Sequence, residues 1–396
     1  MKTLKKDNLL CYFFIIVMYI FVFQDFVQQY IGIARYFDEL LAIMIIPLII
    51  VKVLMKKQWK IKKIDLIILS CLLGILIIGI YANFKYQYQP INIVLSDILV
   101  FYKFFLVYYS FQILNKEKVL QKYSDKIVKH IDFIAIGLFL LTIINYIFEL
   151  FPIGYRYGIM VNQLFYSTPT TLAAVSAFSL CTRIYFSKKI NAISTYLLCI
   201  MIFTTLRIKA IGFIVVFAII SIYVCKTQKK ITPLKIAILG LICLLIAYQQ
   251  IEFYFTETDN SARASLLSTS FKIANDYIPT GAGFATFASH FSGESYSPLY
   301  TMYGIQNVYG LTEAKHNFIS DSFWPMILGQ FGYLGTILYV TVILLIFRKI
   351  QLQYNKDNIY IYIAKLVALA YLIISSTSEA AFVNSFAIGF AIILAL

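Results

Sequence analysis

Long apolar runs separated by short polar segments dominate the chain. Each run is about 20 residues long, the length at which an α-helix crosses a bilayer. The pattern predicts an all-α polytopic membrane protein with about 12 transmembrane helices. The expected spans are residues 9–23, 37–55, 64–84, 96–114, 131–151, 169–186, two within 192–225, 233–255, 322–347, 359–378 and 381–396.

Lysine and arginine clusters between the apolar runs set the expected orientation. Lys2, Lys5 and Lys6 precede the first run, and further basic clusters stand at 56–63 and 226–230. Cytoplasmic loops of membrane proteins carry such an excess of positive charge. No small-residue cleavage site follows the first run, so we expect a retained span there and not a signal peptide. The charges predict a multi-pass membrane protein with cytoplasmic N- and C-termini.

Composition narrows the class further. Of the 396 residues 61% are hydrophobic and 13% are charged, which fits a single integral membrane domain over 1–396. The net charge of +15 would suit nucleic acid, but its lysines and arginines lie between apolar runs, as in cytoplasmic loops. The six cysteines lie in or beside apolar runs without metal-ligand or redox spacing. We therefore expect membrane lipid around the protein, no nucleic-acid partner, no metal and no cofactor.

The segment 115–130 differs from a plain loop. Val119, Leu120, Tyr123 and Ile127 recur at helical spacing, with lysines on the opposite side. This pattern is typical of an amphipathic helix that lies in the membrane interface. We expect such a helix on the cytoplasmic side, before the span at 131–151.

The run at 192–225 is too long for one span and contains two cations, Arg207 and Lys209. A single kinked helix would place both cations in lipid, at a cost of several kcal/mol. We therefore expect two spans joined by a tight outer turn at these two residues. Another outer loop, before the span at 169–186, contains Arg156.

The one long polar segment is 255–321, between the ninth and tenth spans, and we expect it to be extracytoplasmic. Asp259, Asn260 and Ser261 are candidates for a helix N-cap, and Pro279 would end that helix. Arg263 would lie in its first turn, where free backbone N–H groups favour anions. This cation would suit a phosphate ligand, or it would be a snorkelling arginine that meets lipid headgroups.

Two further residues of this segment can carry chemistry. His316 would serve as a general base or a phosphate ligand, or would simply be solvated. Asp321 would accept a proton from a sugar hydroxyl, or would cap the next span at its N-terminus. The pair Gly281 and Gly283 permits close approach to a ligand or an ordinary turn.

The segment also contains Tyr296, Tyr300, Tyr303 and Tyr309. Tyrosines at such positions would stack on sugar faces or would form an interfacial aromatic belt. The sequence leaves both readings open.

Three segments together resemble the O-antigen ligase and polysaccharide polymerase family, especially its capsular repeat-unit polymerases. They are TTLRIKAIGF at 204–213, Arg263 followed by IPTGAGFATF at 278–287, and HNFISDSFWPMILGQFGYLG at 316–335. The resemblance covers about 204–335, and the order of the hydrophobic runs extends it along the chain. It implies a fold similar to that of the GT-C glycosyltransferases.

The resemblance also implies an activity. Such enzymes join glycans carried on undecaprenyl diphosphate, at the outer face of the bacterial cytoplasmic membrane, without metal or nucleotide sugar. The donor is a lipid-linked oligosaccharide, and a flippase and a chain-length regulator are expected partners. By position, Arg207 and Arg263 would hold the diphosphate, with Arg156 and Lys209 as weaker candidates.

The third segment departs from the family pattern. Counted back from Gly332 and Gly335, the family histidine falls on Asp321, and its glutamate falls on Gln330. Either His316 reaches the site from upstream or Asp321 takes that part. Polymerisation is the expected reaction, and the alternatives are transfer to another acceptor, as in a ligase, or transport of the lipid-linked glycan by a flippase. A transporter would carry its charges in mid-span around a central cavity. Here only Lys103, Lys365 and Glu379 are well embedded and the other polar residues lie outside the spans, which favours surface chemistry over transport.

Overall fold

The computed structural model describes residues 2–55, 62–115, 118–151, 154–235, 238, 240 and 261–396. The described structure is mostly helical (73%). Among the described residues, seven helical segments are long and apolar enough to cross a membrane. They are Asn8–Gln28, Lys63–Tyr86, Ile91–Leu114, Val119–Phe148, Ile208–Thr227, Phe323–Leu352 and Lys356–Ser375. The fold is therefore that of a helical, multi-pass membrane protein.

Helices account for nearly all regular structure in the described ranges. The α-helices are α1 Lys2–Gln28, α2 Phe37–Met55, α3 Lys63–Tyr86, α4 Ile91–Leu114, α5 Ser124–Phe148, α6 Pro169–Ser187, α7 Ile193–Thr204, α8 Ile208–Thr227, α10 Ala262–Asp276, α11 His290–Glu294, α12 Pro298–Met302, α13 Phe323–Leu352, α14 Ile359–Ser375 and α15 Ala387–Ala395. Shorter elements are the 3₁₀-helices η1 Gly32–Tyr36, η2 Val119–Tyr123 and η3 Lys356–Asn358, and the antiparallel strands β1 Tyr155–Arg156 and β2 Ile159–Met160.

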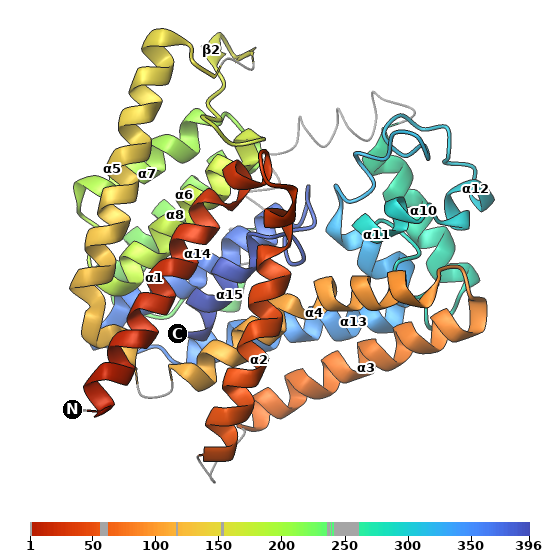
Figure 1. The fold of residues 1–396 in the computed structure, drawn as a ribbon, viewed down its shortest axis with the longest axis horizontal. Helices are drawn as coiled ribbons and strands as arrows, with labels where there is room; N and C mark the ends of the chain where they lie inside the picture. Colours follow the sequence, from red (N-terminus) through yellow and green to blue (C-terminus); the bar gives the residue numbers. More distant parts are fainter. Residues whose placement is uncertain are drawn as a thin grey trace.

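Helix α6 forms the centre of one helical group. Its side chains are buried on all sides from Thr171 to Phe186, and it packs against α5, α7 and α14. Alanine and serine recur along it, so that neighbouring helices can approach closely. Helix α14 continues the group, because it contacts α8 as well as α6. Figure 1 shows this group on one side of the molecule, with the β1–β2 hairpin above the end of α5.

A second helical group consists of α3, α4 and α13, with α2 and α15 packed against α4. Helices α10 to α12 and the turns between them lie over this group (Figure 1), and α10 packs directly on α13. We call residues 261–322 the cap. In Figure 1 the cap and the β1–β2 hairpin lie at one end of the molecule, and the N-terminus lies at the other.

A glycine contact joins the cap to a kink in α13. Gly332 has φ 62° inside this helix, and a Cβ placed there would lie 2.7 Å from the backbone nitrogen of Gly281. The cap backbone also donates to α13, from Ala282 N to Gly329 O at 3.0 Å and from Gly283 N to Gln330 O at 2.8 Å. Gly281 and Gly283 therefore serve close packing of two backbones and not approach to a ligand.

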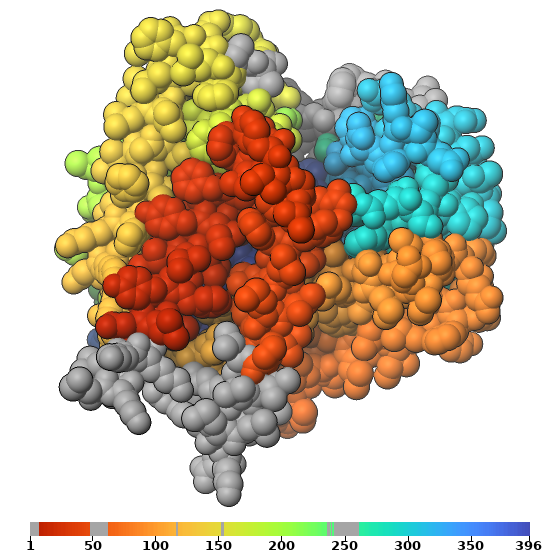
Figure 2. Space-filling view, in the orientation of Figure 1, coloured from red at the N-terminus to blue at the C-terminus, as the bar shows by residue number. Residues whose placement is uncertain are grey.

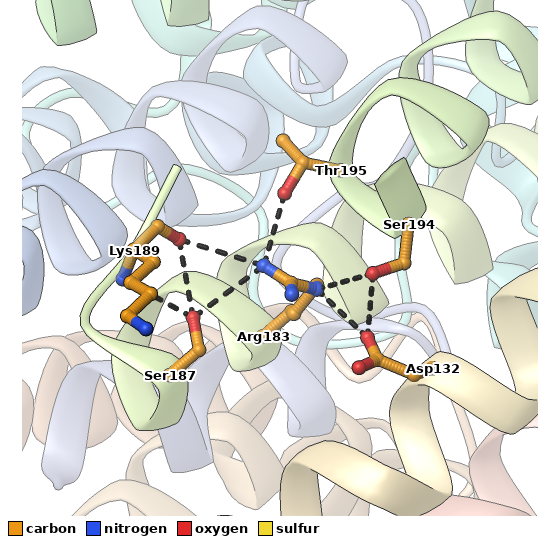
Figure 3. A network of polar contacts seen from close by, with 6 residues as sticks. All are labelled: Asp132, Arg183, Ser187, Lys189, Ser194 and Thr195. Carbon is orange, nitrogen blue, oxygen red and sulfur yellow. Dashed lines mark hydrogen bonds and ion pairs between the residues drawn. The ribbon is translucent and has the colours of Figure 1, made fainter. Parts of the chain in front are cut away.

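A polar network holds α5, α6 and α7 together at the end of α6 (Figure 3). The guanidinium of Arg183 donates from Nε to Asp132 Oδ1 at 2.8 Å and from Nη1 to Thr195 Oγ1 at 3.1 Å. Ser194 donates to the same Asp132 oxygen at 2.6 Å. Arg183 is 5% exposed, so these partners stabilise a charge that is almost removed from solvent.

The structure differs from several of the predictions made from the sequence. The segment at 115–130 is not a separate interfacial helix, because η2 leads directly into α5 and its apolar side chains Val119, Leu120 and Ile127 are buried. In the last expected span, 381–396, the first residues, 381–386, form turns, and helix α15 occupies Ala387–Ala395. The ninth expected span lies largely outside the described residues, as do Asp259 and Asn260 of the expected N-cap.

The long run at 192–225 divides into two helices, but only α8 is long enough to cross a membrane, because α7 has 12 residues. Helix α7 ends at Thr204 and α8 begins at Ile208. Between them Leu206 has φ 49° and is buried, so the turn is tight and locally strained. The turn itself contains Arg207, whereas Lys209 lies in the first turn of α8.

Candidate functional site

A cavity of about 1940 Å³ lies between the two helical groups and the cap. Its wall includes residues of α2, α4, α8, α10, α13 and α14 and of the turns at 376–386. Figure 2 shows α1 and α2, in red, and the cap, in cyan to light blue, next to each other on one face of the molecule. The cavity is much larger than a site for a small metabolite, so it has room for a lipid-sized ligand.

Four cationic side chains from distant parts of the sequence line one part of this cavity: Arg156, Arg207, Lys209 and Arg263. Arg156, on β1, donates from Nη1 to Leu206 O at 3.2 Å, which ties the hairpin to the α7–α8 turn. Arg207 and Arg263 lie close enough to Lys209 to repel its ammonium group. We call these four residues the cation cluster. The structure thus brings all four predicted diphosphate ligands to one cavity.

Two carboxylates accompany the cation cluster. Arg263 Nη2 lies 3.3 Å from Asp321 Oδ2, and Lys209 Nζ lies 2.9 Å from Glu379 Oε2. Arg263 also donates to the carbonyl oxygen of Ser378 at 3.4 Å. Lys209 and Arg263 of the cluster are thus each paired with a carboxylate.

Asp321 is the carboxylate of the cavity that lies beside Arg263. Burial raises its pKa above the usual value, and the neighbouring Arg263 guanidinium partly opposes this shift. The N-cap position of α13 belongs to Ser322. Asp321 therefore does not cap that helix, and it lines the cavity in contact with Arg263 instead.

Helix N-termini add to the positive potential of the cavity. Helices α6, α8, α10 and α13 each contribute a first-turn residue to its wall. None of the four has an acidic side chain in its first turn. The free N–H groups and the dipole at a helix N-terminus favour anions. Together with the cation cluster, these termini make an environment suited to phosphate.

An apolar trough continues from the cation cluster along α8, α13 and α14, and Leu267 of α10 also lines it. Its lining residues are Gly212, Val216, Ile220, Leu267, Ile343, Leu344, Phe347, Leu366, Leu369, Ala370, Ile373 and Ile374. Leu344 and Ile373 are 59% and 40% exposed, so the trough opens on the lipid-facing surface. The cavity therefore combines an anion-binding part with a part that suits a hydrocarbon chain.

A second charged group lies on the α2–α4 wall of the same cavity. Lys103 of α4 forms ion pairs with Asp38 and, at 2.7 Å, with Glu39, both in the first turn of α2. Gln24 of α1 donates to Asp38 at 3.1 Å. Near the cap, Glu294 pairs with His290 at 3.0 Å and with Arg35 at 3.8 Å. These groups offer hydrogen-bond partners for the hydroxyl groups of a sugar.

The structure does not bring every predicted residue to this cavity. Among the described residues, those that line it do not include His316, whose Nδ1 lies 3.0 Å from Glu313 O while its ring packs on Gly293. Tyr300 is fully buried and bonds to Ser292 within the cap, so it serves as core and not as a sugar platform.

Sequence reasoning missed the partners of the embedded charged residues. Lys103 and Glu379 were recognisable as charges within apolar runs, but their partners lie far away in the sequence. Asp38 and Glu39 stand at the start of an apolar run, which was the available signal. Within the described ranges, no group of three or more His, Cys, Asp or Glu side chains is placed to hold a metal ion.

The fold and the cavity define the class of protein: a helical multi-pass membrane protein whose cavity is lined by a cation cluster and an apolar trough. No family model matches the chain, and a search of curated proteins finds no match either.

Proposed function

We propose that the protein is a glycosyltransferase that polymerises oligosaccharide repeat units carried on undecaprenyl diphosphate, at the outer face of a bacterial cytoplasmic membrane. The observation that carries this proposal is the position of the cation cluster. It lines the same cavity as the apolar trough and the polar groups of α2, α4 and the cap. A lipid-linked oligosaccharide has parts of the same three kinds: a diphosphate, a hydrocarbon chain and a glycan.

The proposed role of the cation cluster is to stabilise the diphosphate leaving group. Negative charge develops on the diphosphate as the bond from the sugar C1 to its oxygen breaks. Preorganised cations in a water-poor site stabilise such charge, by about 3–4 kcal/mol for one well-placed donor. Arg207, Arg263 and Lys209 would hold the phosphate oxygens, and Arg156 would hold the turn that presents Arg207, through Leu206.

The acceptor sugar requires a proton acceptor. In the proposed step, an acceptor hydroxyl oxygen attacks C1 of the donor sugar, and its proton passes to the Asp321 carboxylate. The C1–oxygen bond to the diphosphate breaks, and undecaprenyl diphosphate remains on the cation cluster. Asp321 takes this part in preference to His316 because it lines the cavity and its pKa is raised.

A transporter of lipid-linked glycan is the second candidate, and the charges Lys103, Asp38 and Glu39 favour it. These residues line the cavity from within α2 and α4, as charges in a transport pathway do. A transporter moves its substrate without forming a new glycosidic bond, so product analysis separates the two functions.

The proposal is tested with purified protein in liposomes that contain a fluorescent lipid-linked repeat unit. A polymerase produces a ladder of lipid-linked glycans that grows by one repeat unit per step. Transfer only to an added, different acceptor indicates a ligase. Movement of the label across the bilayer without any longer product contradicts the proposal and supports the transporter.

A further inference from the structure

Glu379 lies where a bound phosphate would meet Lys209. Its Oε2 is 2.9 Å from Lys209 Nζ, and its side chain is only 19% exposed. The turn after α14 holds it in place, because its backbone nitrogen donates to Ser375 O at 3.0 Å. The adjacent Ser378 offers its carbonyl oxygen to Arg263 at 3.4 Å. One short segment thus supplies acceptors to two members of the cation cluster.

A partly buried cation without an anionic partner is unfavourable, so an empty cation cluster needs internal counter-ions. Glu379 provides one negative charge to Lys209, and a diphosphate would provide more. Both anions compete for the same ammonium group, so binding of one weakens the hold of the other.

We propose that Glu379 is an exchangeable counter-ion of the cation cluster, which a bound diphosphate displaces from Lys209 and which returns to Lys209 to release the product. This inference rests on the proposed function for its assignment of donor and product. It concerns the affinity of the site and adds no chemical step.

The exchange would help the product to leave the site, because the product carries more negative charge than the donor. Cleavage of the bond to the sugar turns a diphosphate diester into a terminal diphosphate, which gains up to about one further negative charge near neutral pH because its second pKa is about 6. A purely cationic site would therefore hold the product more tightly than the donor. A tethered carboxylate competes with the product and allows turnover to continue.

The test compares the wild type with Glu379→Gln in lipid nanodiscs, with farnesyl diphosphate as the probe and calorimetry as the measurement. Loss of the competing carboxylate is expected to tighten binding about tenfold. The matched control is Glu149→Gln, which neutralises an exposed carboxylate outside the cavity that accepts from the Tyr155 hydroxyl at 2.9 Å. The control is expected to keep the wild-type affinity. Unchanged or weaker binding in folded Glu379→Gln overturns the inference.

A second variant covers the case in which Glu379→Gln does not fold. Glu379→Asp keeps the charge on a shorter side chain, so the carboxylate reaches Lys209 less closely. We expect its affinity for farnesyl diphosphate to lie between those of the wild type and a neutral site, about two- to threefold tighter than wild type. Wild-type or weaker affinity in this variant contradicts the inference.

Kinetics separate counter-ion exchange from a structural role. With lipid-linked repeat units, Glu379→Gln is expected to slow multiple turnover about tenfold while the single-turnover rate stays within about twofold. Equal losses in both rates overturn the inference. If Glu379→Gln binds the probe more tightly but no form of the protein makes polymer, the counter-ion role stands and the proposed polymerase function fails.

Discussion

Replacement of Arg263 by alanine tests the proposed diphosphate site. The guanidinium lies in the first turn of α10 and reaches Asp321 at 3.3 Å and Ser378 O at 3.4 Å. Its side chain is 26% exposed and that of Asp321 is 34% exposed, so their ion pair contributes only about 0–1 kcal/mol to folding. We expect Arg263→Ala to remain folded.

The expected catalytic loss is much larger than the loss of stability. Removal of one preorganised donor to developing negative charge costs about 3–4 kcal/mol of transition-state stabilisation. This corresponds to a fall in kcat/KM of about 10²–10³-fold. Lysine keeps the positive charge but lacks the planar guanidinium with its fixed set of donors. We therefore expect Arg263→Lys to lower kcat/KM by about tenfold, an intermediate loss.

The assay measures polymer formation from lipid-linked repeat units in liposomes, normalised to folded protein. Lys272→Ala is the matched control, because Lys272 is an exposed cation on the same helix α10. It is expected to keep wild-type activity. If folded Arg263→Ala makes polymer at more than a third of the wild-type rate, the phosphate role of Arg263 is wrong.

The remaining predictions concern proton transfer, the cap and the fold. Asp321 must be deprotonated to accept a proton, and burial raises its pKa. As the pH decreases, kcat should therefore begin to fall at a pH above the usual aspartate pKa of about 4. A pH–rate profile that is flat down to about pH 4 contradicts this role. His316→Ala should keep kcat within about threefold of the wild-type value, because the side chain lies away from the cavity. A loss of kcat of about a hundredfold would indicate that His316 is the general base. Gly332→Ala should lower the unfolding temperature in detergent, since its Cβ would meet backbone atoms of the cap within 2.8 Å; an unchanged temperature argues against the kink. Arg183→Ala should lower the free energy of unfolding by about 2–4 kcal/mol, because it leaves Asp132 without its cation, while the rate per folded molecule stays the same. A free energy of unfolding within about 0.5 kcal/mol of wild type contradicts the network in Figure 3.

The helical membrane class follows from the sequence because helix length and lipid thickness are linked by simple geometry. The division of 192–225 at Arg207 was predictable for the same reason, since two cations within a span are costly. Arg263 was also identifiable, because Ser261 caps α10 as expected and its hydroxyl accepts from Ala264 N at 3.2 Å.

Tertiary contacts were beyond the reach of the sequence pattern. Glu379 was visible as an embedded charge, but its pairing with Lys209 depends on how the turn after α14 folds beside α8. The stretch before α15 is apolar enough to suggest a span, yet it forms turns that line the cavity. His316 had a suitable side chain at a suitable place in the sequence, and only the folded cap shows that it packs against Gly293.

A cryo-EM map of the protein in nanodiscs with undecaprenyl diphosphate tests the central claim most directly. Our account predicts diphosphate density in contact with Arg207, Lys209 and Arg263, and density for the lipid chain in the trough between α8, α13 and α14. Lipid density confined to the outer surface of the bundle, with an empty cation cluster at saturating ligand, would contradict it.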